Sequence, residues 1–206
     1  NLRKVSAERI QTELVKLLVS PHPEKMREVW ETGITAVVLP EFDACMNTPQ
    51  NNPHHCGTVG EHTLKTLAGT EAEKTLRLAA LFHDIGKPQT RTTDEEGVDH
   101  FYCHAETGAG MTDAILRRLK FDNETRRRVV RLVRTHDDLR DVSGARAVRR
   151  AVHRIGADIF PDYLKLRRAD ILAQNPAGQQ EKLKALEEAE RLYQEILREK
   201  DCLTLK

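Results

Sequence analysis

The chain has 206 residues, of which 39% are hydrophobic, so it is long enough to build a core of ordinary domain size. Lys and Arg total 33 against 32 Asp and Glu, and this balance excludes an overall electrostatic field that would hold a polyanion. Aromatic residues make up only 4% of the chain, which favours an all-α fold over a β-sandwich or barrel. The longest apolar run, residues 78–82, is far below the roughly 20 residues of a membrane-spanning helix, so no membrane partner is expected.

The cysteines lie far apart in the sequence and form no C-x-x-C pair, which favours free thiols over a disulfide framework. They are Cys45, Cys56, Cys103 and Cys202. Free thiols are typical of a reducing compartment, so a cytoplasmic location is expected. The chain begins at Asn1 without an initiator methionine, a signal peptide or an Arg-rich transit segment, and we expect it to be a piece of a longer protein.

The first 57 residues are predicted to hold three helices followed by a loop. Helical periodicity behind a capping Ser6, and the positions of Pro and Gly, place these helices over 6–18, 23–32 and 35–39. Two prolines, three asparagines and a glycine then predict a loop over 47–57. This loop brings His54 and His55 next to the following helix.

The middle of the chain is predicted to hold two helices that carry ionisable residues. A helix over 58–68 places His62 on its apolar face. Residues 70–73 read as a capping box that opens an apolar helix ending in His83-Asp84. The polar stretch 91–101 is predicted to be either a long loop or a small hairpin.

The last hundred residues are predicted to be helical again, starting near His104. Asp122 can cap a helix whose apolar face includes His136. A helix over 143–155 ends at Gly156, and Pro161 suits the first turn of a helix that carries Asp170. An amphipathic helix is expected over 180–200.

Three histidines and an aspartate fall on or beside the apolar faces of separate predicted helices, where an unpaired ionisable group would be costly. They are His62, His83, His136 and Asp170. Each taken alone could be a core residue with a backbone partner, whereas their convergence would indicate a metal site. Imidazole and carboxylate of His83-Asp84 can both reach a cation that lies over the end of their helix.

A set of residues in this sequence resembles the motif of the HD superfamily of metal-dependent phosphohydrolases. The set consists of His62, then His83-Asp84-Ile85-Gly86-Lys87, and then Asp170. The resemblance covers roughly residues 51–174 and implies an all-α, HD-domain helical bundle. In that family the first His, the His-Asp pair and the distant Asp bind one metal, and members with two metals use two further histidines. His104 and His136 are similar to these, so the implied ligands are His62, His83, Asp84, His104, His136 and Asp170.

Three longer strings resemble the body and HD portion of bacterial CCA-adding tRNA nucleotidyltransferases. They are 49–55 (Pro-Gln-Asn-Asn-Pro-His-His), 92–97 (Thr-Thr-Asp-Glu-Glu-Gly) and 115–121 (Ile-Leu-Arg-Arg-Leu-Lys-Phe). The family's Gly-Ser phosphate loop and Asp-x-Asp pair are absent from this sequence, so nucleotide addition is not assigned to it. We therefore expect a helical linker or body segment over 1–48, an HD domain over 49–175 and a C-terminal helix packed on it over 176–206.

His and carboxylate ligands suit divalent Mn, Fe, Co, Ni or Mg and do not select among them. One or two such ions would orient a phosphate ester and lower the pKa of a water molecule for in-line attack at phosphorus. We expect Asp84 and Lys87 to be catalytic, and Lys87, His54 and His55 to contact substrate. The alternative for Lys87 is a solvated lysine that caps a helix C-terminus, and for either loop histidine it is no role at all.

The resemblance implies a phosphohydrolase or phosphodiesterase that acts on small phosphoesters such as 2',3'-cyclic nucleotides or nucleotide monophosphates. The alternative is a non-catalytic, tRNA-binding body in which the HD site is structural. Arg-rich stretches at 126–134 and 146–154 are read as solvated helix faces, with RNA backbone contact as the alternative. His22, His100 and His153 are expected to be surface or structural residues.

Overall fold

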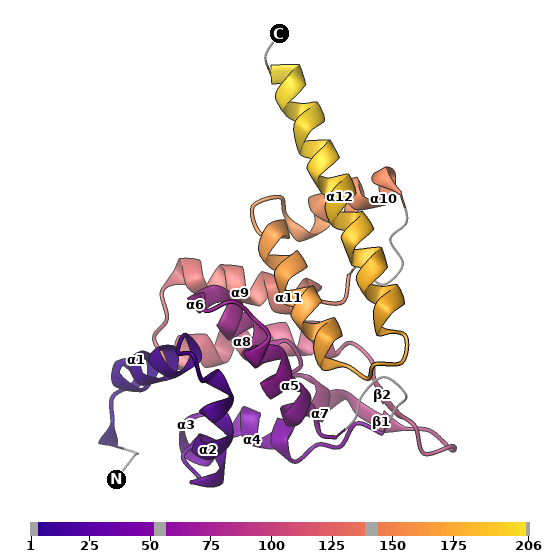
Figure 1. Ribbon diagram of the computed structural model, residues 1–206. Helices are drawn as coiled ribbons and strands as arrows, with labels where there is room; N and C mark the ends of the chain where they lie inside the picture. The colour runs from indigo at the N-terminus through magenta and orange to yellow at the C-terminus, as the bar shows by residue number, and fades with distance from the viewer. Residues whose placement is uncertain (1–3, 52–56, 139–143, 205–206) are drawn as a thin grey trace.

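The computed structural model describes residues 4–51, 57–138 and 144–204, and in this part of the chain helices joined by loops and turns are accompanied by one two-stranded sheet (Figure 1). The prediction of an all-α fold is confirmed. Within these residues, every helix is too short or too polar to cross a membrane. The expected division into segments 1–48, 49–175 and 176–206 stays a prediction.

The N-terminal part consists of short helices, most of them where the sequence predicts them. Ser6 caps the first helix by accepting a hydrogen bond from the backbone N–H of Arg9. A further helix, not predicted from the sequence, begins at Pro40, because proline in a first turn lacks only an N–H that would be unpaired anyway. These elements are α1 (Ala7–Leu18), the 3-10 turn η2 (Pro23–Lys25), α2 (Met26–Glu31), α3 (Thr35–Val38) and α4 (Pro40–Met46).

The rest of the chain alternates helices with short connections and one hairpin. Its elements are α5 (Val59–Ala68), α6 (Lys74–Phe82), α7 (Lys87–Thr90), β1 (Arg91–Thr93), β2 (Asp99–Phe101), α8 (His104–Arg118), α9 (Asn123–Thr135), α10 (Ala145–Ile155), α11 (Phe160–Ala173) and α12 (Gln179–Thr204). Asp122 caps α9 and Pro161 lies in the first turn of α11, as expected. The C-terminal helix α12 packs on α10 and α11 and extends beyond them (Figure 1).

The capping box belongs to α5 and not to α6. Thr58 accepts a hydrogen bond from the backbone of Glu61, whose carboxylate accepts one from the backbone of Thr58. The capping box predicted over 70–73 is wrong, because the carboxylate of Glu73 alone caps α6 by accepting from the N–H of Leu76. Helix α6 therefore begins at Lys74, later than the sequence suggested.

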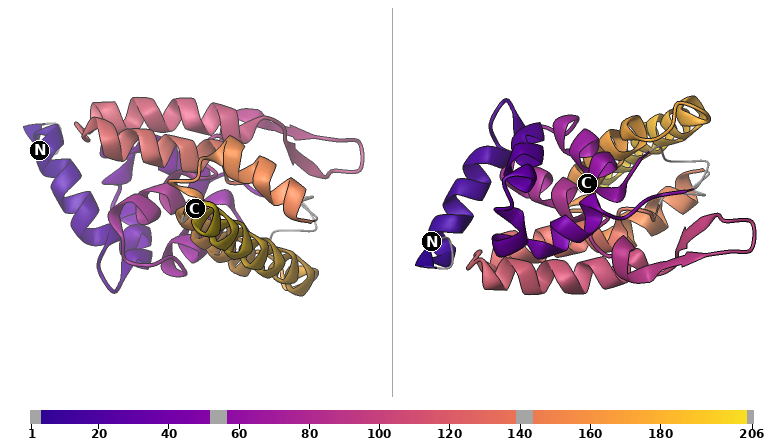
Figure 2. Two further views of the ribbon diagram at one scale, coloured as in Figure 1. Left: turned by 90° about the horizontal axis from the view of Figure 1, so that it is seen from above. Right: turned by 90° about the horizontal axis from the view of Figure 1, so that it is seen from below.

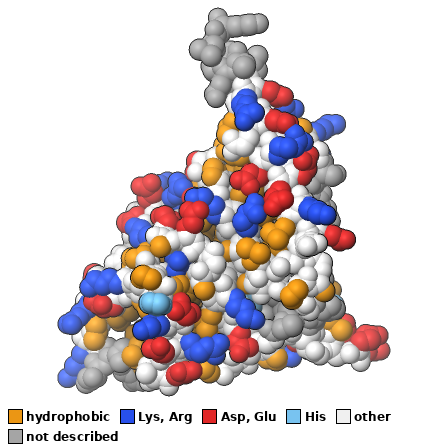
Figure 3. Space-filling view, in the orientation of Figure 1, with side chains coloured by type: hydrophobic (Ala, Val, Ile, Leu, Met, Phe, Trp, Pro, Cys, Tyr) orange, Lys and Arg blue, Asp and Glu red, His pale blue; other side chains and the backbone are white. Residues whose placement is uncertain are grey.

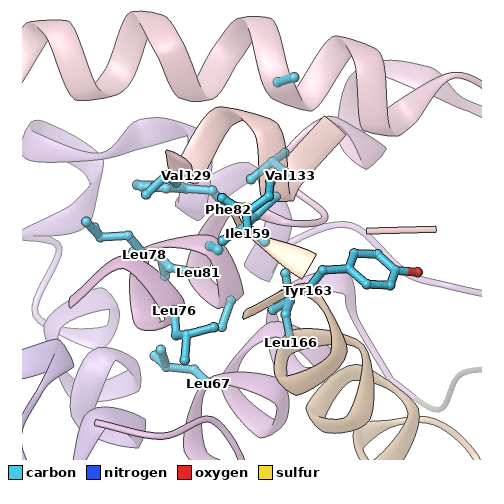
Figure 4. Packing of buried hydrophobic residues seen from close by; sticks show 14 of the residues in the cluster. Leu67, Leu76, Leu78, Leu81, Phe82, Val129, Val133, Ile159, Tyr163 and Leu166 are labelled. Atoms are coloured by element: carbon cyan, nitrogen blue, oxygen red, sulfur yellow. The ribbon is translucent and has the colours of Figure 1, made fainter. Parts of the chain in front are cut away.

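Helix α6 lies at the centre of the core, and every residue from 75 to 82 is buried. It packs against α1, α5, α9 and α11. Figure 4 shows its side chains beside Leu67 of α5, Val129 and Val133 of α9, and Leu166 of α11. Because each buried Leu or Phe stabilises the fold by about 1.5–3 kcal/mol, the C-terminal end of α6 is held firmly in the interior.

The stretch 91–101 forms a hairpin, the second of the two predicted alternatives. Arg91 pairs with Phe101 and Thr93 with Asp99 in antiparallel register. The buried Asp99 carboxylate accepts hydrogen bonds from Arg91 and Thr93, and from the backbone N–H of Asn51 at 2.9 Å. The hairpin projects from the end of the molecule opposite α1 (Figure 2).

Candidate metal centre

All six side chains predicted as metal ligands are buried and converge on one place. Each lies on its own helix or just beyond the end of one. They are His62 on α5, His83 and Asp84 just after α6, His104 as the first residue of α8, His136 just after α9, and Asp170 on α11. The packing of α6 therefore fixes His83-Asp84 in the middle, and the other helices bring their ligands to it.

The first group of donor atoms surrounds one oxygen of Asp84. His62 Nε2 lies 3.2 Å from His83 Nε2, and Asp84 Oδ2 lies 3.6 and 3.2 Å from these two nitrogens. Asp170 Oδ1 lies 3.0 Å from His62 Nε2 and 4.0 Å from His83 Nε2. Two imidazole nitrogens and two carboxylate oxygens thus face one another across a small space.

The second group surrounds the other oxygen of Asp84. His104 Nε2 and His136 Nε2 lie 3.2 Å apart, and Asp84 Oδ1 lies 3.5 and 3.7 Å from them. Asp84 is therefore shared, with Oδ2 facing one histidine pair and Oδ1 facing the other.

These spacings fit divalent cations. Ligand atoms bound at about 2.1 Å lie about 3.0 Å apart when the bonds are at right angles and about 3.4 Å apart at tetrahedral angles. The distances within both groups fall mostly between 3.0 and 3.7 Å. His62, His83 and Asp84 could hold one ion, and Asp84, His104 and His136 could hold another.

Backbone carbonyls fix the tautomers of three of the histidines. Nδ1 of His83, His104 and His136 lies 2.8, 2.8 and 2.7 Å from the carbonyl oxygens of Ala80, Phe101 and Val133 respectively. Because each Nδ1–H donates to a carbonyl, each ring in its neutral form directs the Nε2 lone pair into the centre. In that form the Nε2 atoms of His104 and His136, which lie 3.2 Å apart, could bind one cation together. Burial by itself would lower the pKa of His136, but Asp137 and Asp84 outweigh it and raise that pKa.

The electrostatics of the centre favour ionised carboxylates. Burial by itself would raise the pKa of Asp84, but His83 and Lys87 outweigh it and hold that pKa well below its ordinary value. Burial opposes the ionisation of Asp170 in the same way, and His62 and Arg167 reverse the effect and lower its pKa. Carboxylate oxygens and imidazole nitrogens form a donor set typical of divalent transition metals.

Lys87 lies beside Asp84 and is not the solvated lysine that the sequence left as an alternative. Its side chain is 7% exposed, and Nζ lies 2.7 Å from Asp84 Oδ2. Nζ also donates to Gln50 Oε1 at 2.7 Å and lies over the ring of Phe101. Gln50, which sequence reasoning missed, comes from the segment before α5 and holds the ammonium in place.

Sequence reasoning also missed Asp137 and Arg167. Asp137 follows His136, and its Oδ2 lies 3.4 Å from His104 Nε2. Arg167 is buried one helical turn before Asp170 and donates to Asp170 Oδ2 at 2.5 Å. The sequence feature that could have pointed to Asp137 is the second His-Asp pair, His136-Asp137. The feature that could have pointed to Arg167 is its position three residues before Asp170, which places both on the same face of a helix.

The other predicted residues fall outside the centre. His54 and His55 lie outside the described residues, as does Cys56. His22 and His153 are exposed, and His100 pairs with Asp94 at 2.6 Å on the hairpin, which agrees with surface or structural roles. Cys45 and Cys103 are free thiols, Cys45 buried and Cys103 exposed.

The arginine-rich stretches are offset by acids on neighbouring elements. On α9, the ion pairs are Arg126–Asp113, Arg128–Asp162, Arg131–Asp158 and Arg134–Glu106, and on α10 they are Arg149–Glu199 and Arg154–Asp138. Basic and acidic side chains are interspersed over the face seen in Figure 3. These pairs support the interpretation of solvated faces. Arg127, Arg146 and Arg150 are exposed, and RNA backbone contact stays the alternative.

Comparison with known families identifies the class of protein that has this all-α fold and these convergent His and Asp side chains. Residues 54–174 match the family model of the HD domain. Residues 1–46 match the model described as the probable RNA and SrmB-binding site of polymerase A. The chain belongs to the HD domain family, whose members bind divalent metals.

Two of the curated relatives that the chain matches are named tRNA nucleotidyltransferases, and a third is named a multifunctional CCA protein. The CC-adding tRNA nucleotidyltransferase of Thermus thermophilus is 40% identical over 173 residues, which are 81% of this chain and 39% of that protein. The A-adding tRNA nucleotidyltransferase of Deinococcus radiodurans is 35% identical over 170 residues, 79% of this chain and 38% of that protein. The multifunctional CCA protein of Halorhodospira halophila is 36% identical over 134 residues, 63% of this chain and 32% of that protein. The chain spans about two fifths of the length of the first two relatives, and the resemblances stated from the sequence are confirmed.

Proposed function

We propose that this chain is a metal-dependent phosphohydrolase or phosphodiesterase acting on small phosphoesters such as 2',3'-cyclic nucleotides or nucleotide monophosphates. The proposed metal ligands are His62, His83, Asp84, His104, His136 and Asp170. Divalent Mn, Fe, Co, Ni or Mg suits this donor set, and we propose two ions.

One observation carries the proposal. The two oxygens of Asp84 face two separate histidine pairs, with oxygen-to-nitrogen distances between 3.2 and 3.7 Å. A carboxylate in this position can bridge two cations, and a pair of ions about 3.5–4 Å apart is the arrangement used to clamp a phosphoester in in-line displacement.

The protein's own groups hold this arrangement in place. Lys87 donates to Asp84 Oδ2, which helps to orient the shared carboxylate, and it adds a positive charge beside the proposed metal ligands. Three backbone carbonyls orient the imidazoles so that each presents Nε2. When bound, divalent ions supply Lewis acidity toward the phosphate and lower the pKa of a water molecule toward about 7. His54 and His55 stay proposed substrate contacts.

The test is hydrolysis of bis-p-nitrophenyl phosphate and of 2',3'-cyclic AMP by the protein before and after chelation. We expect chelation to abolish turnover and added Mn or Ni to restore it. His136→Gln should lose activity, whereas His153→Gln, an exposed histidine on α10, should retain it. Full activity in metal-free protein, or in His136→Gln, would contradict the proposal.

The second candidate is a non-catalytic, tRNA-binding module. The match of residues 1–46 to a probable RNA-binding model and the names of the curated relatives favour it. A nitrocellulose filter-binding assay with tRNA tests it, because phosphate contacts make affinity fall steeply with salt. A folded protein that binds tRNA without metal and turns over neither substrate under any metal condition would favour this candidate over the first.

A further inference from the structure

Asp137 lies at the edge of the metal centre, and nothing in the HD resemblance gives it a role. It follows His136 directly after the end of α9, and its side chain is 21% exposed. Its Oδ2 lies 3.4 Å from His104 Nε2 and 3.8 Å from His136 Nε2. A carboxylate oxygen of Asp137 therefore lies near both nitrogens of the second histidine pair, as Asp84 Oδ1 does.

The first and second groups of donor atoms, the two halves of the centre, have the same kinds of ligand once Asp137 is included. In the first half, Asp170 Oδ1 lies 3.0 and 4.0 Å from the Nε2 atoms of His62 and His83. Asp137 Oδ2 has corresponding distances of 3.4 and 3.8 Å in the second half. Each half then offers two imidazole nitrogens, one oxygen of the shared carboxylate and one oxygen of a terminal carboxylate.

A single guanidinium nitrogen joins the two terminal carboxylates. Arg167 Nη1 donates to Asp170 Oδ2 at 2.5 Å and to Asp137 Oδ1 at 3.4 Å. The oxygens that Arg167 engages are the ones that do not face the histidines. The remaining oxygen of each carboxylate is thus directed toward its histidine pair, as is usual for ligands held by an outer hydrogen bond.

We propose that Asp137 is a terminal ligand of the second metal position, beside Asp84, His104 and His136. The inference rests on the proposed metal centre and adds a residue to it. Without Asp137, the second metal position has three protein donors. With Asp137 it has four, the same number as the first position. The alternative is that Asp137 does not bind a metal and interacts only electrostatically with Arg167 and His136.

Equilibrium dialysis of chelator-treated protein against Mn²⁺ tests the assignment without any measurement of activity. Wild type should bind two ions. In Asp137→Asn, we expect the first site to keep its affinity and the second to weaken by at least about tenfold, the effect expected when a residue that holds the metal is lost. Asp138→Asn is the matched control, because Asp138 is the adjacent carboxylate and pairs with Arg154 at 2.7 Å. It should bind both ions as wild type does.

The outcomes separate this inference from the proposed function. Two ions bound with unchanged affinity in Asp137→Asn would overturn the role of Asp137 and leave the centre intact. Fewer than two ions in wild type would overturn both the two-metal centre and this ligand. Anomalous scattering from Mn²⁺-loaded wild-type crystals gives a test independent of the variant's folding. Asp137 Oδ2 within about 2.2 Å of the second ion supports the proposal, and a separation above about 3 Å overturns it.

Discussion

Gly86 sets the distance between the end of α6 and the start of α8, and Gly86→Ala should therefore disturb both stability and the second metal position. A Cβ atom at residue 86 would lie 2.3 Å from the carbonyl oxygen of His104 and 2.6 Å from the backbone nitrogen of Gly108. The first distance is about 1 Å short of ordinary van der Waals contact. Both obstructing atoms belong to the backbone of α8, so no side-chain rotation relieves the clash.

The variant must therefore shift α8 or the segment that follows α6. Overpacking of this kind costs about 1–3 kcal/mol, and we expect about 2–3 kcal/mol because backbone must move on both sides. His104 is the first residue of α8, so the same shift moves its Nε2 away from His136. We expect Gly86→Ala to weaken the second Mn²⁺ site by at least about tenfold and to affect the first site less.

Urea unfolding of the metal-free protein measures the first effect, and Mn²⁺ dialysis measures the second. Gly110→Ala is the control, because Gly110 lies on the same helix and a Cβ there meets nothing within 4 Å. It should stabilise the protein by about 0.5–1 kcal/mol, since alanine is the better helix former. If Gly86→Ala unfolded within about 0.5 kcal/mol of wild type and bound two ions normally, the close approach described above would be refuted.

Asp84→Asn should lose both bound ions in elemental analysis because the amide cannot bridge cations, and full occupancy would contradict the bridging role. Asp122→Ala removes the side chain that accepts from the Thr125 N–H at 2.8 Å and should cost about 1 kcal/mol in urea unfolding at pH 7. Hydrogen bonds from Thr125 lower the pKa of Asp122 from 3.8 to about 2, so this stabilisation is complete above about pH 4 and is lost as the pH falls through 2. A difference between Asp122→Ala and wild type that persisted undiminished below pH 2 would contradict that reasoning. Finally, Mn²⁺ at 100 times its Kd should raise the free energy of unfolding by about 2.7 kcal/mol per site, and an unchanged melting temperature would exclude tight binding to the folded state.

Local periodicity predicted that some of the candidate ligands face inward, because it reports which face of a helix is buried, whereas the full ligand set was implied by the resemblance to the HD superfamily. His62 and His136 stand on or beside apolar faces, and both are buried in the structure. The caps at Ser6 and Asp122 were predictable for a similar reason, since each is a contact within four residues. Such patterns depend only on residues that are close together in the sequence, so a short stretch of chain is enough to predict them.

Contacts between distant segments were not predictable in this way. Lys87 is buried because Gln50 and Asp84 surround its ammonium, and Gln50 lies 37 residues earlier in the chain. Asp137 approaches His104 of α8 and Arg167 of α11, and the periodicity of α9 does not report contacts with other helices. The predicted capping box at 70–73 had the right residue types, but the capping box forms at Thr58 and Glu61 instead.

The central claim is that Asp84 lies between two metal positions. Anomalous scattering measured at the manganese edge from Mn²⁺-loaded crystals tests it most directly. We predict two peaks about 3.5–4 Å apart, one beside His62 and His83 and the other beside His104 and His136, with one oxygen of Asp84 on each. A single peak, or no peak at these residues, would contradict the claim.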